Sequence, residues 1–342
     1  MRALSSVDKV VEARNHSPIL SNVVLTAEAD RLLLRGTDME IEVTTSCAAK
    51  CDAGTTAAPA KRLLDIARKV TGDEVTMSLS GANLAIKSGR SNFKLPTLSA
   101  GLLPTLSAGE FSHGFTANLS ALLSAVSFAV AANDPARHFL EGVYLREHEG
   151  RLRAVGADGH RLAYQDGPSV EPFDGVILPR KIVGLLSAFD GDAKVELSAN
   201  MARFSIGNTT FVSRLIEGTY VDYIRFWPKG NENVLRVDRA ALRAAVDRVG
   251  LVDVNGRGVK LSMAQGSVLL SVKDASGESS EEVPAEYTGA PADVGYQVGY
   301  LSEILGKVPG ETVCIEVGEG PGTNFSGDTG WAGVLMRYRV AA

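Results

Sequence analysis

The chain has 342 residues, of which 45% are hydrophobic and 22% charged, and its formal net charge at neutral pH is −5. This composition suits two or three globular domains with real cores. No stretch reaches the roughly 20 apolar residues that a membrane-spanning helix needs, and the polar start, Met1–Arg14, lacks the apolar core of a signal peptide. We therefore expect a cytoplasmic protein without a membrane partner.

Six short helices are predicted from apolar spacing and helix-start signals, two to each third of the chain. Between them, period-two alternation and turn sequences such as Ser80–Asn83 predict antiparallel hairpins. A helix that covers one face of such hairpins makes an α+β fold. The helices are expected at about 1–14, 60–70, 118–131, 179–189, 238–252 and 299–307, and the clearest strands at 74–80, 84–87, 93–95, 194–198, 203–206 and 211–214.

The chain repeats itself three times. Similar segments at Arg31–Asp38, Arg151–Asp158 and Ser267–Asp274 end in aspartates that are 120 and 116 residues apart. Short amphipathic helices open at positions 59, 179 and 298, with nearly the same spacing. A period this long indicates a triplicated domain, because solenoid units span only about 20 to 50 residues. We therefore predict three tandem similar domains, each of two helix-plus-strand halves, at 1–108, 109–230 and 231–342.

Charge is distributed unevenly between the predicted helices and the rest of the chain. The helical windows contain thirteen lysines and arginines but six acids, so they carry +7 and the remainder carries −12. Helix propensity favours glutamate as well as lysine and arginine, yet only two of the six acids are glutamate. A basic helical layer on an acidic strand-rich shell would attract a phosphate backbone on one face only.

Cysteine and histidine do not form a recognisable metal site. Cys47 and Cys51 have no second pair to complete a zinc site, and Cys314 stands alone. We expect reduced structural thiols, no metal and no cofactor. Asp158 and His160 could be an acid–base pair, but no phosphate loop, nucleophile elbow or metal spacing accompanies them. The alternative is that Asp158 caps a turn.

Several stretches, taken in order and at three-domain spacing, carry a family resemblance. They are Ser17–Asn22, Gly36–Val43, Phe139–Val143, Ala157–Ala163, Leu178–Lys181 and Glu217–Tyr223. The chain resembles the bacterial DNA polymerase III beta subunit family, the replicative sliding clamps, over nearly its whole length. The resemblance implies a non-catalytic head-to-tail homodimer that closes into a ring of six domains around duplex DNA, without sequence specificity.

The same resemblance implies a set of residues that approach DNA. Arg14 and Arg137 have the alternative of being ordinary solvated loop cations. Arg180 and Lys181 follow the helix-opening Pro179, where the helix dipole disfavours cations, which favours a functional role. The implied DNA-binding residues are Arg14, Arg137, His138, Phe139, Arg180 and Lys181.

A cleft for short hydrophobic peptides, between the second and third domains, is also implied. Its expected partners are the replicative polymerase catalytic subunit, the clamp loader and repair proteins. For Leu140, Leu162 and Val334 the alternative is plain core packing, whereas Met336 and Tyr338 lie near the chain end and are expected to be exposed. The implied cleft residues are Leu140, Gly159, His160, Arg161, Leu162, Val221, Arg225, Phe226, Val334, Met336, Tyr338 and Arg339.

The dimer interface is implied to pair an edge strand near 92–98, with Phe93 and Leu95, with the third domain of a second copy. Leu251 and Val252 would add apolar contact, and their alternative is packing within the domain.

Two departures from the family pattern affect these expectations. The chain starts inside the first helix, so the first domain is expected to lack the family's first strand. Arg337 and Tyr338 stand where the family usually has proline and methionine, and they would narrow and polarise the cleft. The alternative function is a clamp-like protein that cannot close on DNA and only binds clamp-binding peptides.

Overall fold

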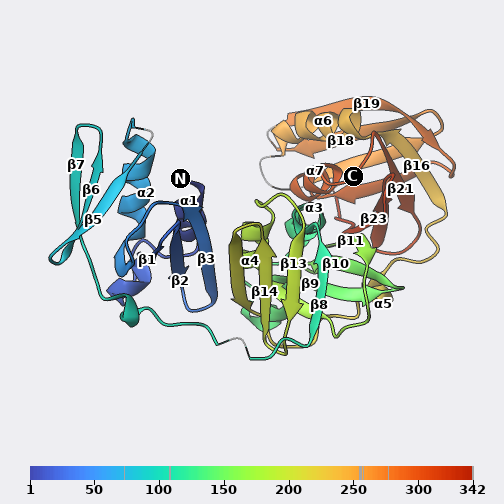
Figure 1. Cartoon of the computed structure of the whole chain (residues 1–342). Coiled ribbons are helices and arrows are strands. Elements are labelled where there is room, and N and C mark those ends of the chain that lie inside the picture. The colour runs from blue at the N-terminus through green and yellow to red at the C-terminus, as the bar shows by residue number, and fades with distance from the viewer. Residues whose placement is uncertain (73, 108, 254–255, 257, 276, 341–342) are drawn as a thin grey trace. The chain divides into compact units, whose positions relative to one another are not determined.

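The computed structural model describes residues 1–72, 74–107, 109–253, 256, 258–275 and 277–340. These residues form two compact units, which are drawn in Figure 1. Unit 1 contains Met1–Asn118 and Phe189–Leu215, and unit 2 contains Leu119–Ala188 and Ile216–Ala342. Both units combine helices with antiparallel sheets, so the predicted α+β class is confirmed.

Unit 1 contains two sheets and two helices. The larger sheet has the strand order β4-β1-β2-β3-β15-β14-β13-β8, and the smaller has the order β5-β6-β7. The larger sheet's strands are β1 (Asn22–Glu28), β2 (Arg31–Thr37), β3 (Ile41–Ala48), β4 (Gly54–Pro59), β8 (His113–Ala117), β13 (Ala193–Leu197), β14 (Met201–Ile206) and β15 (Thr209–Arg214). The other elements are β5 (Thr76–Ser80), β6 (Asn83–Ser88), β7 (Ser91–Pro96), α1 (Arg2–Asp8), α2 (Ala60–Lys69) and the 3₁₀ helices η1 (Pro18–Ser21) and η2 (Ala100–Leu102).

Unit 2 is built on one long sheet with the order β12-β9-β10-β11-β23-β22-β21-β16-β19-β18-β17-β20. Its strands are β9 (Gly142–His148), β10 (Arg151–Ala157), β11 (Arg161–Ser169), β12 (Val176–Pro179), β16 (Asn233–Asp238), β17 (Val259–Ala264), β18 (Ser267–Asp274), β19 (Gly277–Tyr287), β20 (Ala292–Tyr296), β21 (Thr312–Val317), β22 (Gly322–Ser326) and β23 (Trp331–Met336). Its helices are α3 (Leu119–Val126), η3 (Ser127–Ala129), η4 (Pro135–Leu140), α4 (Arg180–Leu186), α5 (Tyr223–Phe226), α6 (Arg239–Val249), η5 (Gly250–Val252) and α7 (Val298–Leu305).

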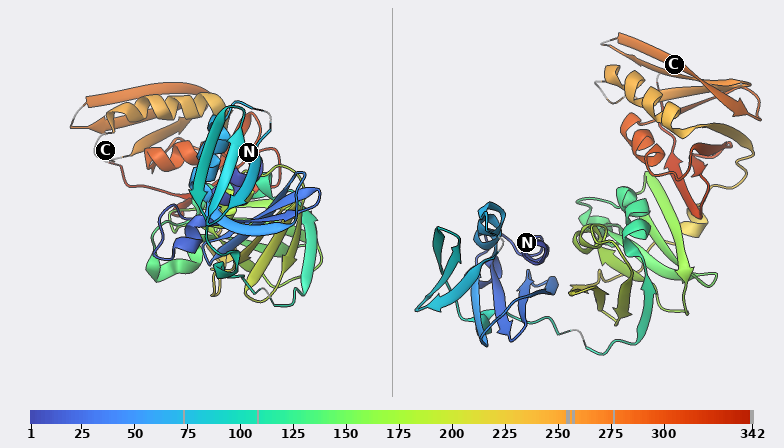
Figure 2. Two further views of the ribbon diagram at one scale, coloured as in Figure 1. Left: turned by 60° about the vertical axis from the view of Figure 1, so that its left-hand side comes forward. Right: turned by 45° about the horizontal axis from the view of Figure 1, so that its top comes forward.

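Helix α6 illustrates how the sequence specifies these elements. Asp238 accepts a hydrogen bond from the amide of Ala241 at 2.7 Å, which satisfies a free donor at the helix start. Leu242, Val246 and Val249 recur at helical spacing and are buried. Helix α6 contacts β18 and β19 and lies beside α7, and the two helices can be followed in Figure 2 within unit 2.

The predicted repetition is confirmed at its landmarks. The three similar segments are strands β2, β10 and β18, and the three helix openings lead into α2, α4 and α7. The carboxylate of Asp38 accepts hydrogen bonds from two following amides, at 2.9 and 2.6 Å, and that of Asp158 does the same at 2.8 and 2.9 Å. The two aspartates therefore cap equivalent turns, as predicted for Asp158.

Strand pairing also joins successive thirds of the chain in a repeated way. The strand that follows the repeated segment in one repeat pairs antiparallel with the last strand of the next: β3, which follows β2, with β15 in unit 1, and β11, which follows β10, with β23 in unit 2. Each of these two joints continues a sheet from one third of the chain into the next.

Some predicted helix limits are wrong. The first helix ends at Asp8 rather than at residue 14, and the third ends at Val126 before the 3₁₀ turn η3. A Cβ atom on Gly36 would lie only 2.7 and 2.8 Å from side-chain atoms of Val7 and Val11. Val7, in the last turn of α1, and Val11, beyond its end, pack on the bare backbone of β2.

Candidate partner-binding site and nucleic-acid interface

One apolar cluster in unit 2 gathers several of the predicted cleft residues. Leu140, Leu162 and Val334 are 3%, 9% and 5% exposed, and half-buried Val221 packs against them. Leu162 and Val334 are direct partners across β11 and β23, while Leu140 comes from η4. The three aliphatic residues are thus core residues, as the packing alternative held. Together with Val221, they bring four predicted cleft positions into contact.

Aromatic residues of the segment 216–227 cover this part of the sheet. The rings of Tyr144 and Tyr220 stack with centroids 4.7 Å apart, and Tyr164 contacts Trp227 at 5.1 Å. Burial raises the pKa of the Tyr220 hydroxyl well above its ordinary value. The segment is therefore fastened to the sheet by rings on β9 and β11.

Large apolar side chains remain exposed on α5 and at or beyond the end of β23. Phe226 is 71% exposed, Ile224 44%, Tyr338 41% and Met336 38%. Sequence reasoning missed Ile224, whose place between Tyr223 and Phe226 on α5 was the available signal. Exposed apolar residues of this kind are candidates for a protein-binding surface.

The guanidinium of Arg161 makes ion pairs and cation–π contacts with other residues of unit 2. Its Nε donates to Asp158 at 3.0 Å, and its guanidinium also pairs with Glu303 of α7. The same group lies 4.5 Å from the ring centre of Tyr300 and 5.3 Å from that of Phe128. Arg161 therefore ties the second repeat to the third.

Gly159 and His160 form the turn before Arg161. Gly159 has φ +90°, and a Cβ there would approach Nη1 of Arg137 to 2.6 Å, so this turn requires glycine. The exposed ring of His160 lies 5.8 Å from that of Tyr300, and its carbonyl accepts the amide of Met336 at 2.8 Å.

The last residues run away from β23 along the third repeat. The amide of Arg337 donates to Pro321 at 2.8 Å, and its guanidinium bonds to the carbonyl of Gly318. The amide of Tyr338 donates to Gly295 of β20 at 2.8 Å. Arg339 is exposed beyond this contact, and so is Arg225 on α5.

The predicted DNA-binding loop is part of the same region. Arg137 donates to Asp134 at 2.8 Å, and this side-chain hydrogen bond lowers the pKa of that carboxyl. A ring nitrogen of His138 lies 3.0 Å from the carbonyl of Glu217, while Phe139 packs against the apolar cluster. Arg137 and His138 are exposed. The loop therefore has two polar residues at the surface and one aromatic residue, Phe139, on the cluster.

The other predicted DNA-binding residues are also exposed. Arg180 and Lys181 lie in the first turn of α4, and Arg180 reaches the carbonyl of Ala131 at 3.5 Å. Arg14 belongs to unit 1, in the segment after α1. Helices α1, α2, α3, α4, α6 and α7 contain ten lysines and arginines but four acids, which keeps the predicted excess of positive charge on helices.

The residues considered for a metal site or an acid–base pair are spread over both units. They contain no group of three or more His, Cys, Asp or Glu that could hold a metal ion. The Asp158 carboxylate is used by its own turn and by Arg161, which leaves His160 without an acid partner there. Nor is any of the described helices long and apolar enough to cross a membrane. Cys47, Cys51 and Cys314 are free thiols.

Of the predicted interface residues, Leu251 in η5 is the most exposed large apolar side chain, at 81%. Val252 and Phe93 are half-buried, and Leu95 is buried at 5% exposed. Phe93 and Leu95 belong to β7, which is an edge of its three-stranded sheet.

Comparison with known proteins decides the family. Models of the DNA polymerase III beta subunit match in order: the N-terminal domain at residues 1–107, the central domain at 116–222 and the C-terminal domain at 224–320. The chain belongs to the DNA polymerase III beta subunit family. This family comprises the sliding clamps, the processivity factors of DNA replication.

Individual relatives agree with this membership. The beta sliding clamp of Caulobacter vibrioides is 36% identical over 91% of this chain and 88% of its own length, and that of Escherichia coli is 31% identical over 92% and 89%. A crystal structure of the Bartonella birtlesii clamp bound to griselimycin superposes with a TM-score of 0.92 at 36% identity, covering 99% of this chain and 97% of that one. A Pseudomonas aeruginosa clamp with the same ligand gives 0.93 at 32% identity, covering 99% and 96%.

Proposed function

We propose that this beta subunit is a homodimeric ring that encircles duplex DNA, has no catalytic activity, and docks partner peptides through their hydrophobic residues. The observation that carries the ring is the pairing of successive repeats, β3 with β15 and β11 with β23. Each joint uses the strand that follows β2 or β10 in one repeat and the last strand of the next.

Under this pairing between successive repeats, one strand in the first repeat and one in the last have no neighbouring repeat to pair with. The last strand of the first repeat is β7, which pairs only with β6 among the described strands. The equivalent strand of the last repeat is β19, which follows β18 and pairs with β16 only at residues 285–287, so its first part is open on that edge. Two copies placed head to tail would join β7 to β19 twice and close a ring with C2 symmetry.

Apolar contacts would support the new joint. The exposed Leu251 belongs to η5, which packs on β18 and β19. Main-chain hydrogen bonds between edge strands supply the pairing, and buried apolar surface adds roughly 25 cal/mol per Å². Phe93, Leu95, Leu251 and Val252 are the proposed interface residues.

A ring holds DNA by enclosure, so its phosphate contacts need not be strong. The six helices have a net positive charge. Arg14, Arg137, His138, Phe139, Arg180 and Lys181 are the proposed residues near the duplex. Such contacts recognise the backbone without distinguishing sequence, and dense ion pairing would impede sliding.

Peptide docking is proposed at the apolar cluster and its rim. Aliphatic walls, exposed aromatic residues and an adaptable methionine suit short hydrophobic segments of the replicative polymerase, the clamp loader and repair proteins. The proposed site comprises Leu140, Gly159, His160, Arg161, Leu162, Val221, Arg225, Phe226, Val334, Met336, Tyr338 and Arg339, together with Ile224.

The test measures the mass of the chain by light scattering at micromolar concentration, and its retention on nicked circular DNA before and after linearisation. A dimer of twice 36.1 kDa that stays on circles and leaves linear ends is expected. Leu251→Glu should weaken the dimer at least 10-fold, whereas Leu269→Glu, which adds the same charge at another exposed leucine, should not. A monomeric wild-type chain that still binds clamp-binding peptides would favour the clamp-like alternative instead.

A further inference from the structure

We propose that Arg153 and Asp166 are positioning residues for the peptide-docking surface, because they hold α5 in place through Tyr164 and Trp227. This inference rests on the proposed peptide docking and adds a mechanism to it. Neither residue was among the sites expected from the sequence, and neither needs to touch the peptide.

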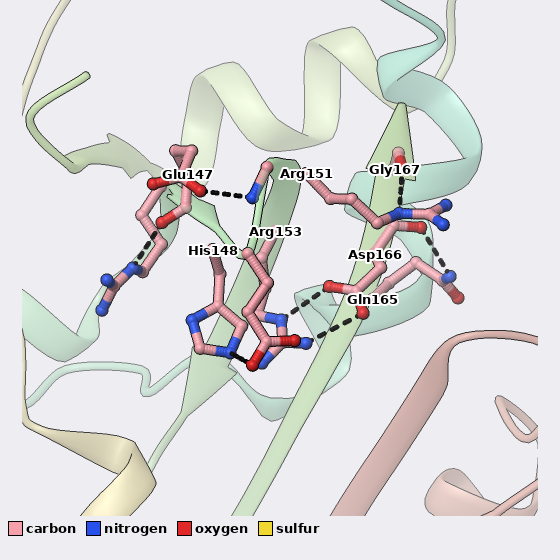
Figure 3. A network of polar contacts seen from close by, with 10 residues as sticks. Glu147, His148, Arg151, Arg153, Gln165, Asp166 and Gly167 are labelled. Carbon is pink, nitrogen blue, oxygen red and sulfur yellow. Dashed lines mark hydrogen bonds and ion pairs between the residues drawn. The ribbon is translucent and has the colours of Figure 1, made fainter. Parts of the chain in front are cut away.

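The pair itself is well formed. Arg153 on β10 and Asp166 on β11 face each other across the sheet, and Figure 3 shows their side chains pointing toward one another. Nε lies 2.6 Å from Oδ1 and Nη2 lies 2.9 Å from Oδ2, a bidentate geometry that fixes the guanidinium plane. The side chains are only 11% and 18% exposed, so removal of one partner would leave a largely buried charge unpaired.

The guanidinium of Arg153 in turn contacts Tyr164, which contacts Trp227; we call these two rings the aromatic relay. The Arg153 Cζ lies 4.0 Å from the ring centre of Tyr164, within the range of a cation–π contact. Tyr164 contacts the indole of Trp227, with ring centroids 5.1 Å apart and an interplanar angle of 50°. The pair thus acts on the residue that directly follows α5.

Helix α5 depends on such support. It has four residues and no side-chain cap, and a single helical turn is not stable by itself. Tyr223 at its start is buried in the apolar cluster at 2% exposed, and Trp227 holds its end. Between these anchors, Ile224 and Phe226 are held outward at 44% and 71% exposed.

Charge and burial agree with a fixed pair. Burial acts to lower the pKa of the Arg153 guanidinium, but its contacts with Asp166 and Tyr223 outweigh this and raise it. The backbone nearby is also held: the amide of Asp166 donates to Gly330 at 3.0 Å, and Nε of Arg151 donates to Gly167 at 3.0 Å (Figure 3). The pair is therefore a rigid base for the relay.

The first test compares peptide affinities. We would titrate the full chain into a fluorescein-labelled peptide carrying the clamp-binding segment of the organism's replicative polymerase. Arg153→Met, which keeps the apolar stem, should weaken binding by roughly 5- to 20-fold, and Arg153→Lys by less. Arg203→Met is the matched control, because Arg203 also lies over a ring, that of Phe111 at 4.1 Å, and pairs with Glu196 at 3.5 Å. It should leave the affinity unchanged.

A combined mutant decides whether Arg153 acts through α5. The pair Ile224→Ala and Phe226→Ala should itself weaken binding, and Arg153→Met added to both should cost no more than about 2-fold further, because the side chains being positioned are already gone. Additive losses would overturn the relay, and so would an unchanged affinity in Arg153→Met.

Trp227 gives a readout that needs no peptide. The chain has two tryptophans, and Trp331 is only 2% exposed, so acrylamide quenches mainly Trp227. Quenching should increase in Arg153→Met and in Asp166→Asn at unchanged far-ultraviolet circular dichroism. Increased quenching in a chain that binds no peptide would refute the proposed docking but keep the positioning role. Unchanged quenching would refute the positioning role even if docking holds. If Arg153→Met fails to fold, Arg153→Lys and Asp166→Asn carry the same comparison.

Discussion

Equivalent strands of the three repeats have very different surroundings. Strand β5 is the first of the last three strands of the first repeat, and every described residue of it is exposed, with Leu79 at 54%. Strands β13 and β21 are the first of the last three strands in the second and third repeats, where Leu197 and Ile315 are 2% and 1% exposed. Similar local sequence patterns thus end in opposite environments.

The difference comes from the neighbouring strand. β13 lies between β14 and β8, and β21 lies between β22 and β16. Among the described strands, β5 pairs only with β6. Alternation of apolar residues fixes which face of a strand can be buried, but a second neighbour determines whether it is. The inward face of β5 therefore presents Met77 and Leu79 at an open edge.

The largest effect should come from a charge placed on the inward face. Val195→Lys in β13 puts an ammonium group at a fully buried site and should destabilise unit 1 by about 4 kcal/mol or more. Met77→Lys in β5, where the side chain is 37% exposed, should change the free energy of unfolding by less than about 1 kcal/mol. Urea denaturation followed by circular dichroism measures both, since both tryptophans belong to unit 2. Equal destabilisation would mean that β5 is covered in solution.

A matched pair of leucines gives a smaller effect. Leu197→Ala removes a buried side chain and should cost about 2 to 5 kcal/mol through lost burial and the cavity that remains. Leu79→Ala makes the same chemical change at an exposed site and should cost less than about 1 kcal/mol. Both residues lie in unit 1, so the same denaturation experiment compares them directly. A larger loss for Leu79→Ala would reverse the comparison.

The sequence predicts repeated elements well because its signals there are local. Apolar periodicity located the helices, and the spacing of Asp38, Asp158 and Asp274 located the three repeats. It overextended α1, after which Val11 packs on Gly36, a contact between elements that no local pattern encodes. The sequence did not predict the one-turn helix α5 for a similar reason, since the residues that Tyr223 and Trp227 pack against lie on other elements.

The candidate site was predictable only in part. Family resemblance supplied Leu140, Leu162 and Val334, which the fold does bring together. It could not supply the pairing of Arg161 with Glu303, which lie 142 residues apart and meet only in the folded chain. Nor could it supply the chain of contacts from Arg153 to Trp227, because each step depends on strand register and ring orientation.

The smallest effect concerns the outward face of the same strands. β13 carries Lys194 and Glu196, which pair with each other at 3.1 Å, whereas the outward residues of β5 are Thr76, Ser78 and Ser80. The side-chain hydrogen bond from Lys194, aided by Arg203, lowers the pKa of Glu196 below its ordinary value of 4.5. Glu196→Gln should therefore cost about 0.5 kcal/mol or less at pH 7.

The pH dependence follows from the direction of that shift. Since the pKa of Glu196 is lower in the folded state, its stabilisation is fully present above 4.5 and is lost as pH falls through the lowered folded value. The difference in urea midpoint between wild type and Glu196→Gln should shrink below pH 4.5 and vanish once the carboxyl is protonated in both states. Ser78→Gln, a matched outward change on β5, should show no such trend, because it removes no ionisable group. A difference that widened on acidification would mean that burial, rather than the lysine and arginine neighbours, controls this carboxyl, and that the outward face of β13 is less open than its exposed charges indicate.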